Sequence, residues 1–341
     1  MNKVIYPSLI LGGLLIYTWT FFFPLVPLEE GDSVASLLIE LGEEPMPHQP
    51  DFTIEGVSVE RGEALFTQGI AEKPGGGNTK KQSSHFVCTS CHNIQKEDPD
   101  LSISDPQARL EYVKSQGLPF LQGTALYGAV NRSSFYNGYY EEKYGDLVKP
   151  ARNDIREAIQ LCAIECSQGR LLEDWELESI LAYLWTLDLK LEDLKLNQQE
   201  MDQLAQAKAG RGNNKQAVNL LKSKYLDGSP ATFLKPPTDR KAGYPNLTGN
   251  PDNGALIYEL SCLHCHEGGR YAFFELDGSK ESFRYLQKHI GRYTRYSIYQ
   301  VARYGTTPLN GKRSYMPNFT AEKMSNQQLE DLRAYIEQQS E

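Results

Sequence analysis

The sequence predicts a mainly α-helical protein, with two tandem domains behind an N-terminal transmembrane helix. Three observations predict this fold class: an uncharged apolar run at the N-terminus, a C-x-x-C-H motif that occurs twice, and a segment near the middle of the chain that recurs near its end. A length of 341 residues, with 40% hydrophobic and 23% charged residues, suits two folded units and a linker.

The composition restricts the function classes. A formal net charge of −9 at pH 7 argues against a broad basic face, so we expect no nucleic-acid partner. Six cysteines are too few for a disulfide scaffold in a chain of this length, and their spacing therefore points to metal or cofactor chemistry. They form three pairs: Cys88 and Cys91, Cys162 and Cys166, and Cys262 and Cys265.

The apolar run covers residues 4–28, contains no charged residue, and is long enough to cross a hydrocarbon core of about 30 Å as a helix. Lys3 precedes it and three acidic residues follow it, so the positive-inside rule places the N-terminus in the cytoplasm. We therefore expect a single-pass anchor over residues 1–28 that contacts the lipid bilayer of the inner (cytoplasmic) membrane through residues 4–28. Both domains would lie on the periplasmic or extracytoplasmic side. The alternative is a cleavable signal peptide with a small-x-small site at residues 33–35.

The two C-x-x-C-H motifs, at residues 88–92 and 262–266, are the attachment signature of c-type haem. Two thiols at this spacing reach the two vinyl groups of a porphyrin, and the adjacent imidazole is held under the iron. A zinc site would need further Cys or His pairs, and none has suitable spacing. We therefore predict two covalently attached haem c groups, bound by Cys88, Cys91, His92, Cys262, Cys265 and His266, with both histidines as iron ligands.

Around the second motif the sequence resembles the class I cytochromes c over nearly all of residues 250–341. A lead-in helix precedes Cys262, residues 314–319 resemble the loop of the family's distal methionine, and an amphipathic helix is expected over residues 326–338. The resemblance implies that Met316 is the distal ligand of the second iron, with the alternatives His289 and Lys312. A His/Met pair raises the reduction potential, which suits an electron acceptor or relay.

The first domain contains the same parts. Residues 61–66 form a similar lead-in helix, a Gly- and Lys-rich insertion at residues 72–84 is expected as a surface loop, and residues 177–184 repeat residues 329–336 position by position. The predicted division is a transmembrane anchor (1–28), a stalk (29–54), cytochrome c domain 1 (55–190), a linker (191–249) and cytochrome c domain 2 (250–341).

The repeat aligns Met316 with Ile164, which lies between Cys162 and Cys166, and no methionine occurs between Met46 and Met201. A cysteine thiolate, from Cys162 or Cys166, is therefore expected as the distal ligand of the first iron. The alternatives are a Cys162–Cys166 disulfide with His48 or His85 or no sixth ligand, and cysteines that serve only as small core residues.

Residues 162–170 are also similar to the ligand segment of dihaem cytochromes of the thiosulfate dehydrogenase type. That resemblance implies a His92/Cys162 pair at the first haem and a sulfur substrate. The Tyr- and Asn-rich stretch at residues 126–140 is not part of that pattern. It is expected as a loop over the haem edge, with Arg132 on a propionate or with the loop only shielding the porphyrin.

Three function classes follow. The first is a membrane-anchored dihaem cytochrome that transfers electrons between a respiratory membrane oxidoreductase and a terminal oxidase or soluble electron carrier. The second is a sulfur-oxidising enzyme, and the third is a structural subunit of a respiratory assembly. Around the second haem, basic residues alternate with tyrosines, either as a docking patch for an acidic partner or as a solvated helix face with propionate partners. These basic residues are Arg284, Lys288, Arg292, Arg295 and Arg303.

Overall fold

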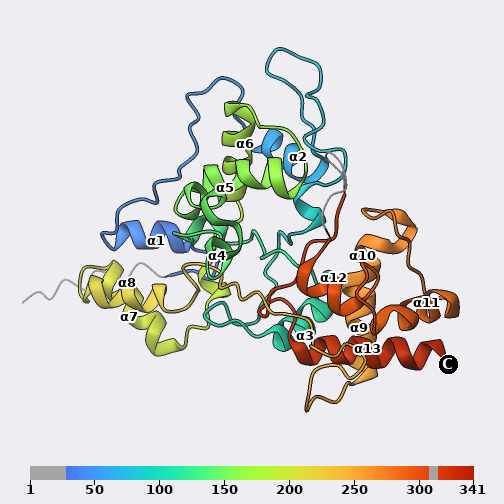
Figure 1. The fold of residues 1–341 in the computed structure, drawn as a ribbon. Coiled ribbons are helices and arrows are strands. Elements are labelled where there is room, and N and C mark those ends of the chain that lie inside the picture. Colours follow the sequence, from blue (N-terminus) through green and yellow to red (C-terminus); the bar gives the residue numbers. More distant parts are fainter. Residues whose placement is uncertain (1–27, 307–313) are drawn as a thin grey trace, which may run out of the picture.

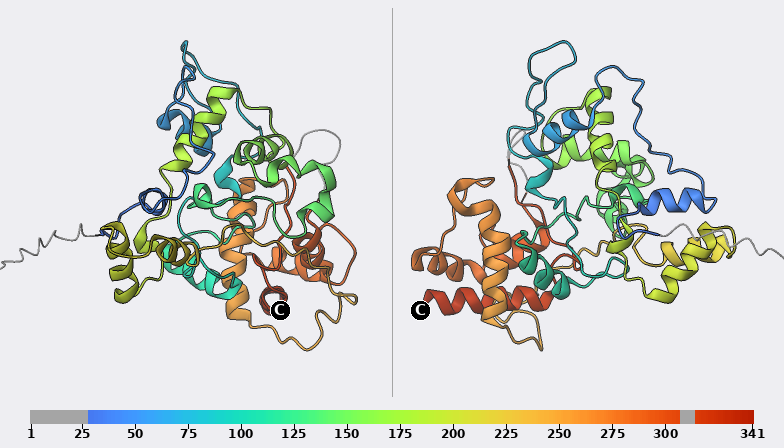
Figure 2. Two further views of the ribbon diagram at one scale, coloured as in Figure 1. Left: turned by 90° about the vertical axis from the view of Figure 1, so that its left-hand side faces the viewer. Right: turned by 180° about the vertical axis from the view of Figure 1, so that it is seen from behind.

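The computed structural model describes residues 28–306 and 314–341. The described chain is mainly helical, and its β-structure consists of two isolated bridges. The longer helices form three groups that lie at three corners of the molecule in every view (Figures 1 and 2). Each group surrounds its own apolar cluster.

The first group contains helices from the predicted first domain. It consists of α2 (Val59–Gln68), α5 (Ile155–Leu161) and α6 (Asp174–Trp185). Helix α2 begins after Ser58, whose hydroxyl caps it, and ends at Gly69 in the left-handed conformation. Its cluster contains Phe66 and Leu181, which are 1% and 0% exposed.

The second group contains helices from the predicted second domain. It consists of α9 (Pro251–Ile257), α10 (Leu263–His266), α11 (Lys280–Ile290), α12 (Ile298–Tyr304) and α13 (Asn326–Ser340). The expected amphipathic helix is α13, which buries Leu329 and Ile336 completely. The internal repeat therefore ends in equivalent helices, α6 and α13.

The repeat extends to tertiary packing. An added Cβ at Gly62 in α2 would lie 1.9 Å from the Ser179 carbonyl oxygen in α6, and one at Gly254 in α9 would lie 2.0 Å from the Asp331 carbonyl oxygen in α13. Ser179 and Asp331 occupy equivalent positions. Their side chains accept the amide hydrogens of the helix caps Ser58 and Asn250, at 3.2 and 2.8 Å. The two domains thus share one helix crossing, which needs glycine at the contact.

The third group contains residues that were predicted as stalk and linker. It consists of α1 (Val34–Glu40), α7 (Gln198–Lys208) and α8 (Asn214–Lys222). Leu37, Leu204 and Leu221 lie in one buried cluster, so these segments pack on each other. The predicted domain limits stay predictions.

Two further α-helices lie between the first motif and α5: α3 (Pro106–Gln116) and α4 (Tyr140–Tyr144). Helix α3 has readable signals, an Asp105 cap, Pro106 at its first position and Gly117 after its end. It belongs to the first domain by sequence, yet Leu110 and Val113 lie in the apolar cluster of the second group.

The remaining helical segments are short. The 3₁₀ turns are η1 (Cys88–Ser90), η2 (Ala129–Asn131), η3 (Gly145–Leu147), η4 (Pro150–Arg152), η6 (Leu191–Asp193) and η8 (Glu267–Gly269). The π-helical turns are η5 (Cys162–Cys166) and η7 (Tyr258–Cys262), and both contain predicted site residues.

The predicted fold class needs one correction. No helix within residues 28–306 and 314–341 is both long enough and apolar enough to cross a membrane, so the transmembrane helix is not supported. The apolar run that suggested it falls on residues 1–27, outside the described residues, apart from Leu28. The supported fold class is mainly α-helical.

Candidate haem sites

Site 1 consists of Cys88, Cys91 and His92. The first cysteine begins the turn η1, and both thiols are free. The His92 Nδ1 atom lies 2.7 Å from the Thr124 carbonyl oxygen, so this nitrogen donates and Nε2 is the nitrogen left for a metal. Burial lowers the pKa of His92, which favours the neutral imidazole that ligates iron.

Site 2 consists of Cys262, Cys265 and His266 and has the same arrangement. Helix α9 continues through the π turn η7 to Cys262, and α10 carries the other two residues. The His266 Nδ1 atom lies 2.5 Å from the Phe274 carbonyl oxygen, and burial lowers the pKa of this histidine too. At both sites the thiols and the ligating nitrogen fit the donor set of haem c.

Gly123 makes the close packing around His92 possible. An added Cβ there would lie 2.6 Å from the His92 ring and 2.4 Å from the Cys91 carbonyl oxygen. The Gly123 amide donates to that same carbonyl at 3.0 Å. The backbone before Thr124 therefore lies directly on the histidine.

The predicted distal segment of the first domain is the π turn η5. All four thiols of the first domain share one region, because charge at Cys88 and Cys91 contributes to the raised pKa of Cys162. A hydrogen bond to Cys166 is the main cause of that raised pKa, and the same bond lowers the pKa of Cys166. Both thiols are free in the structure.

Tyr136 contacts the same sulfur. Its hydroxyl oxygen lies 3.9 Å from Cys166 Sγ, and its φ of +48° lies in the left-handed region that is unusual for an aromatic residue. Tyr140 and Tyr144 continue a stack of phenol rings beside it. Cys166 therefore shares hydrogen bonds with both Tyr136 and Cys162, and this arrangement was not visible in the sequence.

The insertion at residues 72–84 holds this turn. Gln82 Nε2 donates to the Ala163 carbonyl oxygen at 2.8 Å, and Ser83 Oγ donates to the Ser167 carbonyl oxygen at 2.5 Å. The Arg170 amide donates back to the Gln82 carbonyl oxygen at 2.9 Å. The insertion, expected only as a surface loop, thus clamps the cysteine turn, and no sequence motif indicated this.

The histidine alternatives in the first domain have other contacts. His48 is 6% exposed, its Nε2 donates to the Val130 carbonyl oxygen at 2.7 Å, and its ring packs on Trp185. The ring of His85 lies beside Phe86, immediately before site 1. Neither contact brings an imidazole nitrogen to the cysteine turn.

Met316 lies against the apolar cluster of the second group. Its amide donates to Thr306 Oγ1 and its carbonyl accepts from the Thr306 amide, both at 2.8 Å, which fixes the backbone of this loop. The alternative His289 lies 3.1 Å from Thr294 Oγ1 through Nδ1, and Lys312 lies outside the described residues. Met324 is 1% exposed and is a core residue, as expected.

The two sites are neighbours. Charge at Cys265 contributes to the raised pKa of Cys91, after burial. The Ser90 carbonyl contacts the His264 side chain, partly offsetting the burial that lowers the pKa of His264. Tyr315, next to Met316, packs edge-on against Phe86 at 5.9 Å between ring centres. Residues of the second domain therefore line the region around site 1.

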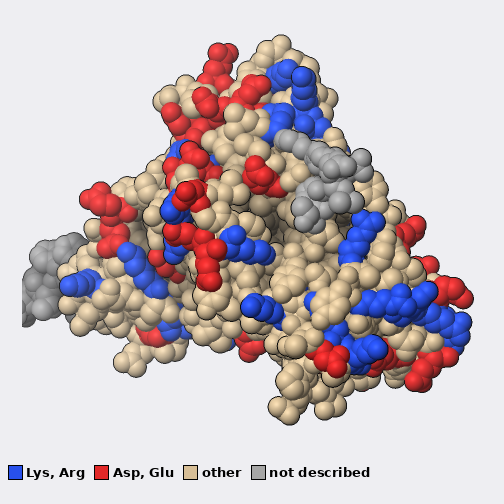
Figure 3. Space-filling view, viewed as in Figure 1, with Lys and Arg blue, Asp and Glu red and all other residues tan. Residues whose placement is uncertain are grey.

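The basic patch is smaller than the sequence suggested. Arg303 and Tyr299 are both fully buried, and Arg303 donates to the Met324 carbonyl oxygen at 2.8 Å. Arg292 and Arg295 are exposed. Lys and Arg side chains gather over α11 and its surroundings on the face drawn in Figure 3, with acidic residues at the margin.

Comparison with protein families supports one part of this assignment. Residues 249–336, about a quarter of the chain, match the family described as "Cytochrome C oxidase, cbb3-type, subunit III". Neither the comparison with curated proteins nor that with solved structures gave a match. Domains of this kind bind haem c covalently, transfer electrons and are typically extracytoplasmic. Residues 249–336 are thus similar to a c-type cytochrome domain.

Proposed function

We propose that this protein is a dihaem c-type cytochrome that passes single electrons between a respiratory oxidoreductase and a terminal oxidase or soluble carrier. Each haem would supply a one-electron iron couple. The chain would bind it through the paired thiols and orient His92 and His266 through backbone carbonyls.

The adjacency of the two sites carries this proposal. Cys91 and Cys265 are close enough for their charges to interact, and Tyr315 joins the loop of Met316 to Phe86 beside site 1. An electron relay needs two redox groups a short distance apart. Two domains with widely separated sites would not provide that short distance. Basic side chains over α11 suit an acidic partner protein (Figure 3).

Intact-mass spectrometry of the full chain, matured with haem, tests the proposal. We expect two haems in the wild type and one haem in each of two variants, Cys88→Ala/Cys91→Ala and Cys262→Ala/Cys265→Ala. Stopped-flow reduction should then show electron exchange between the haems only in the wild type. A wild-type chain with a single haem and an unmodified peptide over residues 88–92 would contradict it.

A sulfur-oxidising enzyme is a second candidate. The observation that favours it is the pair of free thiols, Cys162 and Cys166, in the same region as the attachment thiols of site 1. If the protein is such an enzyme, we expect steady-state reduction of the haems by thiosulfate. Absence of reduction by thiosulfate and by other sulfur anions would exclude the enzyme and leave the relay.

A further inference from the structure

The histidines of the two sites reach their carbonyl acceptors over very different lengths of chain. His266 bonds to a carbonyl 8 residues later, at Phe274, whereas His92 bonds to one 32 residues later, at Thr124. A loop of 8 residues places its own acceptor locally. An excursion of 32 residues has more conformational freedom, so Thr124 needs an additional support.

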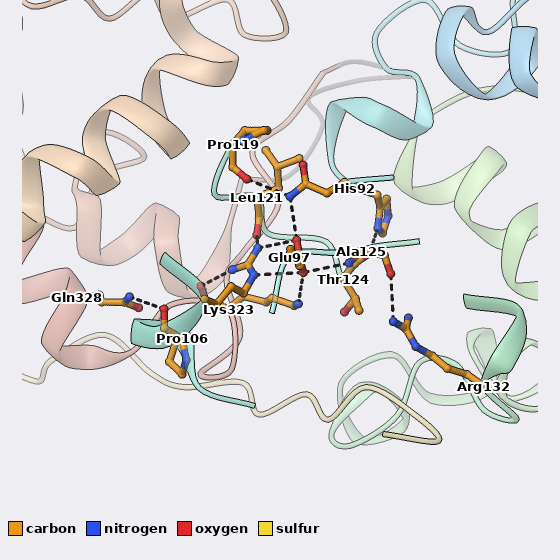
Figure 4. Close-up of polar contacts among 12 residues, drawn as sticks. His92, Glu97, Pro106, Pro119, Leu121, Thr124, Ala125, Arg132, Lys323 and Gln328 are labelled. Carbon is orange, nitrogen blue, oxygen red and sulfur yellow. Dashed lines mark hydrogen bonds and ion pairs between the residues drawn. The ribbon is translucent and has the colours of Figure 1, made fainter. Parts of the chain in front are cut away.

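That support is a single carboxylate, Glu97, which is 1% exposed (Figure 4). Its Oε1 atom accepts from the Ala125 amide at 3.1 Å, and its Oε2 atom accepts from Asn93 Nδ2 at 2.9 Å. Asn93 follows His92, and Ala125 follows Thr124. Glu97 therefore holds the chain immediately after the donor and immediately after the acceptor of the histidine hydrogen bond.

The charge of Glu97 is balanced by two cations from different parts of the chain. Arg109 of helix α3 lies 3.2 Å away through Nε, and Lys323 Nζ lies 2.8 Å from Oε1. Lys323 belongs to the second domain and immediately precedes the core residue Met324. A buried carboxylate requires such partners, and loss of one partner is strongly destabilising.

The same excursion is fixed to the second domain elsewhere. The Phe120 amide donates to the Leu260 carbonyl oxygen at 2.9 Å, and Arg109 donates to the Lys323 carbonyl oxygen at 3.1 Å. Gln328 of α13 donates to the Pro106 carbonyl oxygen at 2.8 Å. The support of His92 therefore runs through both domains.

We propose that Glu97 and Lys323 are positioning residues for His92, so that docking of the second domain determines the ligand geometry and the reduction potential of the haem at site 1. The inference rests on the proposed dihaem function. Its physical basis is that outer hydrogen bonds fix the ring orientation and basicity of a ligating histidine. When the ion pair is broken, Ala125 and Thr124 lose their anchor and the imidazole gains rotational freedom.

The test uses the full, haem-loaded chain with Glu97→Gln, Lys323→Met, their double variant, the conservative Lys323→Arg and the control Glu178→Gln. Glu178 is also buried and pairs with Arg156 at 2.5 Å, but it lies in the first group and holds α6 to α5. The readouts are the electron paramagnetic resonance g values and haem methyl NMR shifts, which report ligand orientation, and the midpoint potential of each haem.

We expect Glu97→Gln and Lys323→Met to shift the signals and the potential of the site 1 haem. The double variant should shift them less than the sum, because the two residues act through one contact. Lys323→Arg should restore the wild-type values. Glu178→Gln should lower the midpoint of unfolding without moving either readout.

Unchanged site 1 signals in both Glu97→Gln and Lys323→Met, at whatever stability, would overturn the inference. If Glu97→Gln does not fold, the comparison of Lys323→Met with Lys323→Arg decides the question alone. A wild-type mass with one haem would instead remove the proposed function, so the two failures are distinguishable.

Discussion

The two domains are alike around their C-x-x-C-H motifs and different around the positions predicted for the distal iron ligands. Both have a glycine at a close helix crossing, a C-x-x-C-H motif and a histidine that donates to a backbone carbonyl. At the predicted distal position, the second domain has Met316 in its own loop, whereas the first has two thiols in a π turn held by an insertion. The helix crossing and the motif, which both domains share, therefore belong to the common fold. The predicted distal segments, which differ, would give the two sites different chemistry.

The domains also differ in how self-contained they are. Site 2 is formed within the second group, and the carboxylate beside its acceptor carbonyl, Glu275, is exposed. Site 1 depends on Lys323 and on Tyr315, both from the second domain. The comparison shows that the surroundings of site 1 include residues of the second domain.

The largest expected effect is the loss of a sulfur ligand, and it tests the chemical difference between the domains. Met316→Ala should abolish the absorption band of methionine-ligated ferric haem, because the iron loses its distal ligand. Cys162→Ala should abolish a low-spin thiolate signal in electron paramagnetic resonance. Survival of that signal in Cys162→Ala and its loss in Cys166→Ala would transfer the assignment to Cys166, the sulfur that shares a hydrogen bond with Tyr136.

Acid should separate the two sites. Burial opposes the charge of Glu97, but Arg109 and Lys323 outweigh it and hold the pKa of this carboxyl well below its usual range. A carboxyl with a lowered pKa stabilises the fold above the unfolded value of about 4.3 and loses this contribution as the pH falls. Glu97→Gln should therefore cost about 3 kcal/mol at pH 7 and progressively less below pH 4.

Urea unfolding of the wild type and Glu97→Gln across this pH range measures that difference. As the pH is lowered, we expect the haem signals to show that His92 dissociates from its iron at a higher pH than His266 does. Equal sensitivity of both histidines would remove the distinction between a site that depends on its neighbour and one that does not.

The shared helix crossing should respond equally in both domains. Gly62→Ala and Gly254→Ala each place a Cβ within 2.0 Å of a carbonyl oxygen, and the helices must separate. We expect about 2 kcal/mol of destabilisation from each. Gly75→Ala is the matched control, since no atom lies within 4 Å of its added Cβ. Chemical unfolding measures the stability of all three variants. An unchanged stability of Gly62→Ala would mean that the two domains share a sequence repeat but not the close helix crossing.

The smallest expected effect concerns Tyr136. Tyr136→Phe removes one hydrogen bond to Cys166. If Cys166 rather than Cys162 ligates the first iron and the Tyr136 hydroxyl is the donor, this loss makes the sulfur more electron-rich and favours ferric iron. A net hydrogen bond of about 1 kcal/mol corresponds to a decrease of about 40 mV in the midpoint potential of the first haem. Tyr144→Phe is the control, and an equal shift there would assign the effect to the phenol stack as a whole.

The sequence predicted the helical class, the repeat and the closing helix, because these depend on local periodicity and on residues a few positions apart. The boundary signals of α3, at Asp105, Pro106 and Gly117, are local too, but this helix was not predicted, and only the structure shows that it packs on the second domain. Glu97 was not predictable, since its role comes from partners 12 and 226 residues away. Long-range contacts of this kind leave no pattern in a single sequence.

The long excursion after His92 also has a consequence for the order of assembly. A chain made from its N-terminus presents the first C-x-x-C-H motif before residues 124, 260 and 323 exist, although all three belong to the support of His92 or of the segment that carries its acceptor. In the proposed dihaem protein, thioether formation at site 1 would therefore precede folding, whereas its final ligand geometry would be reached only after nearly the whole chain has been made. The haem proposed for site 1 would thus be attached first and reach its final ligand geometry last.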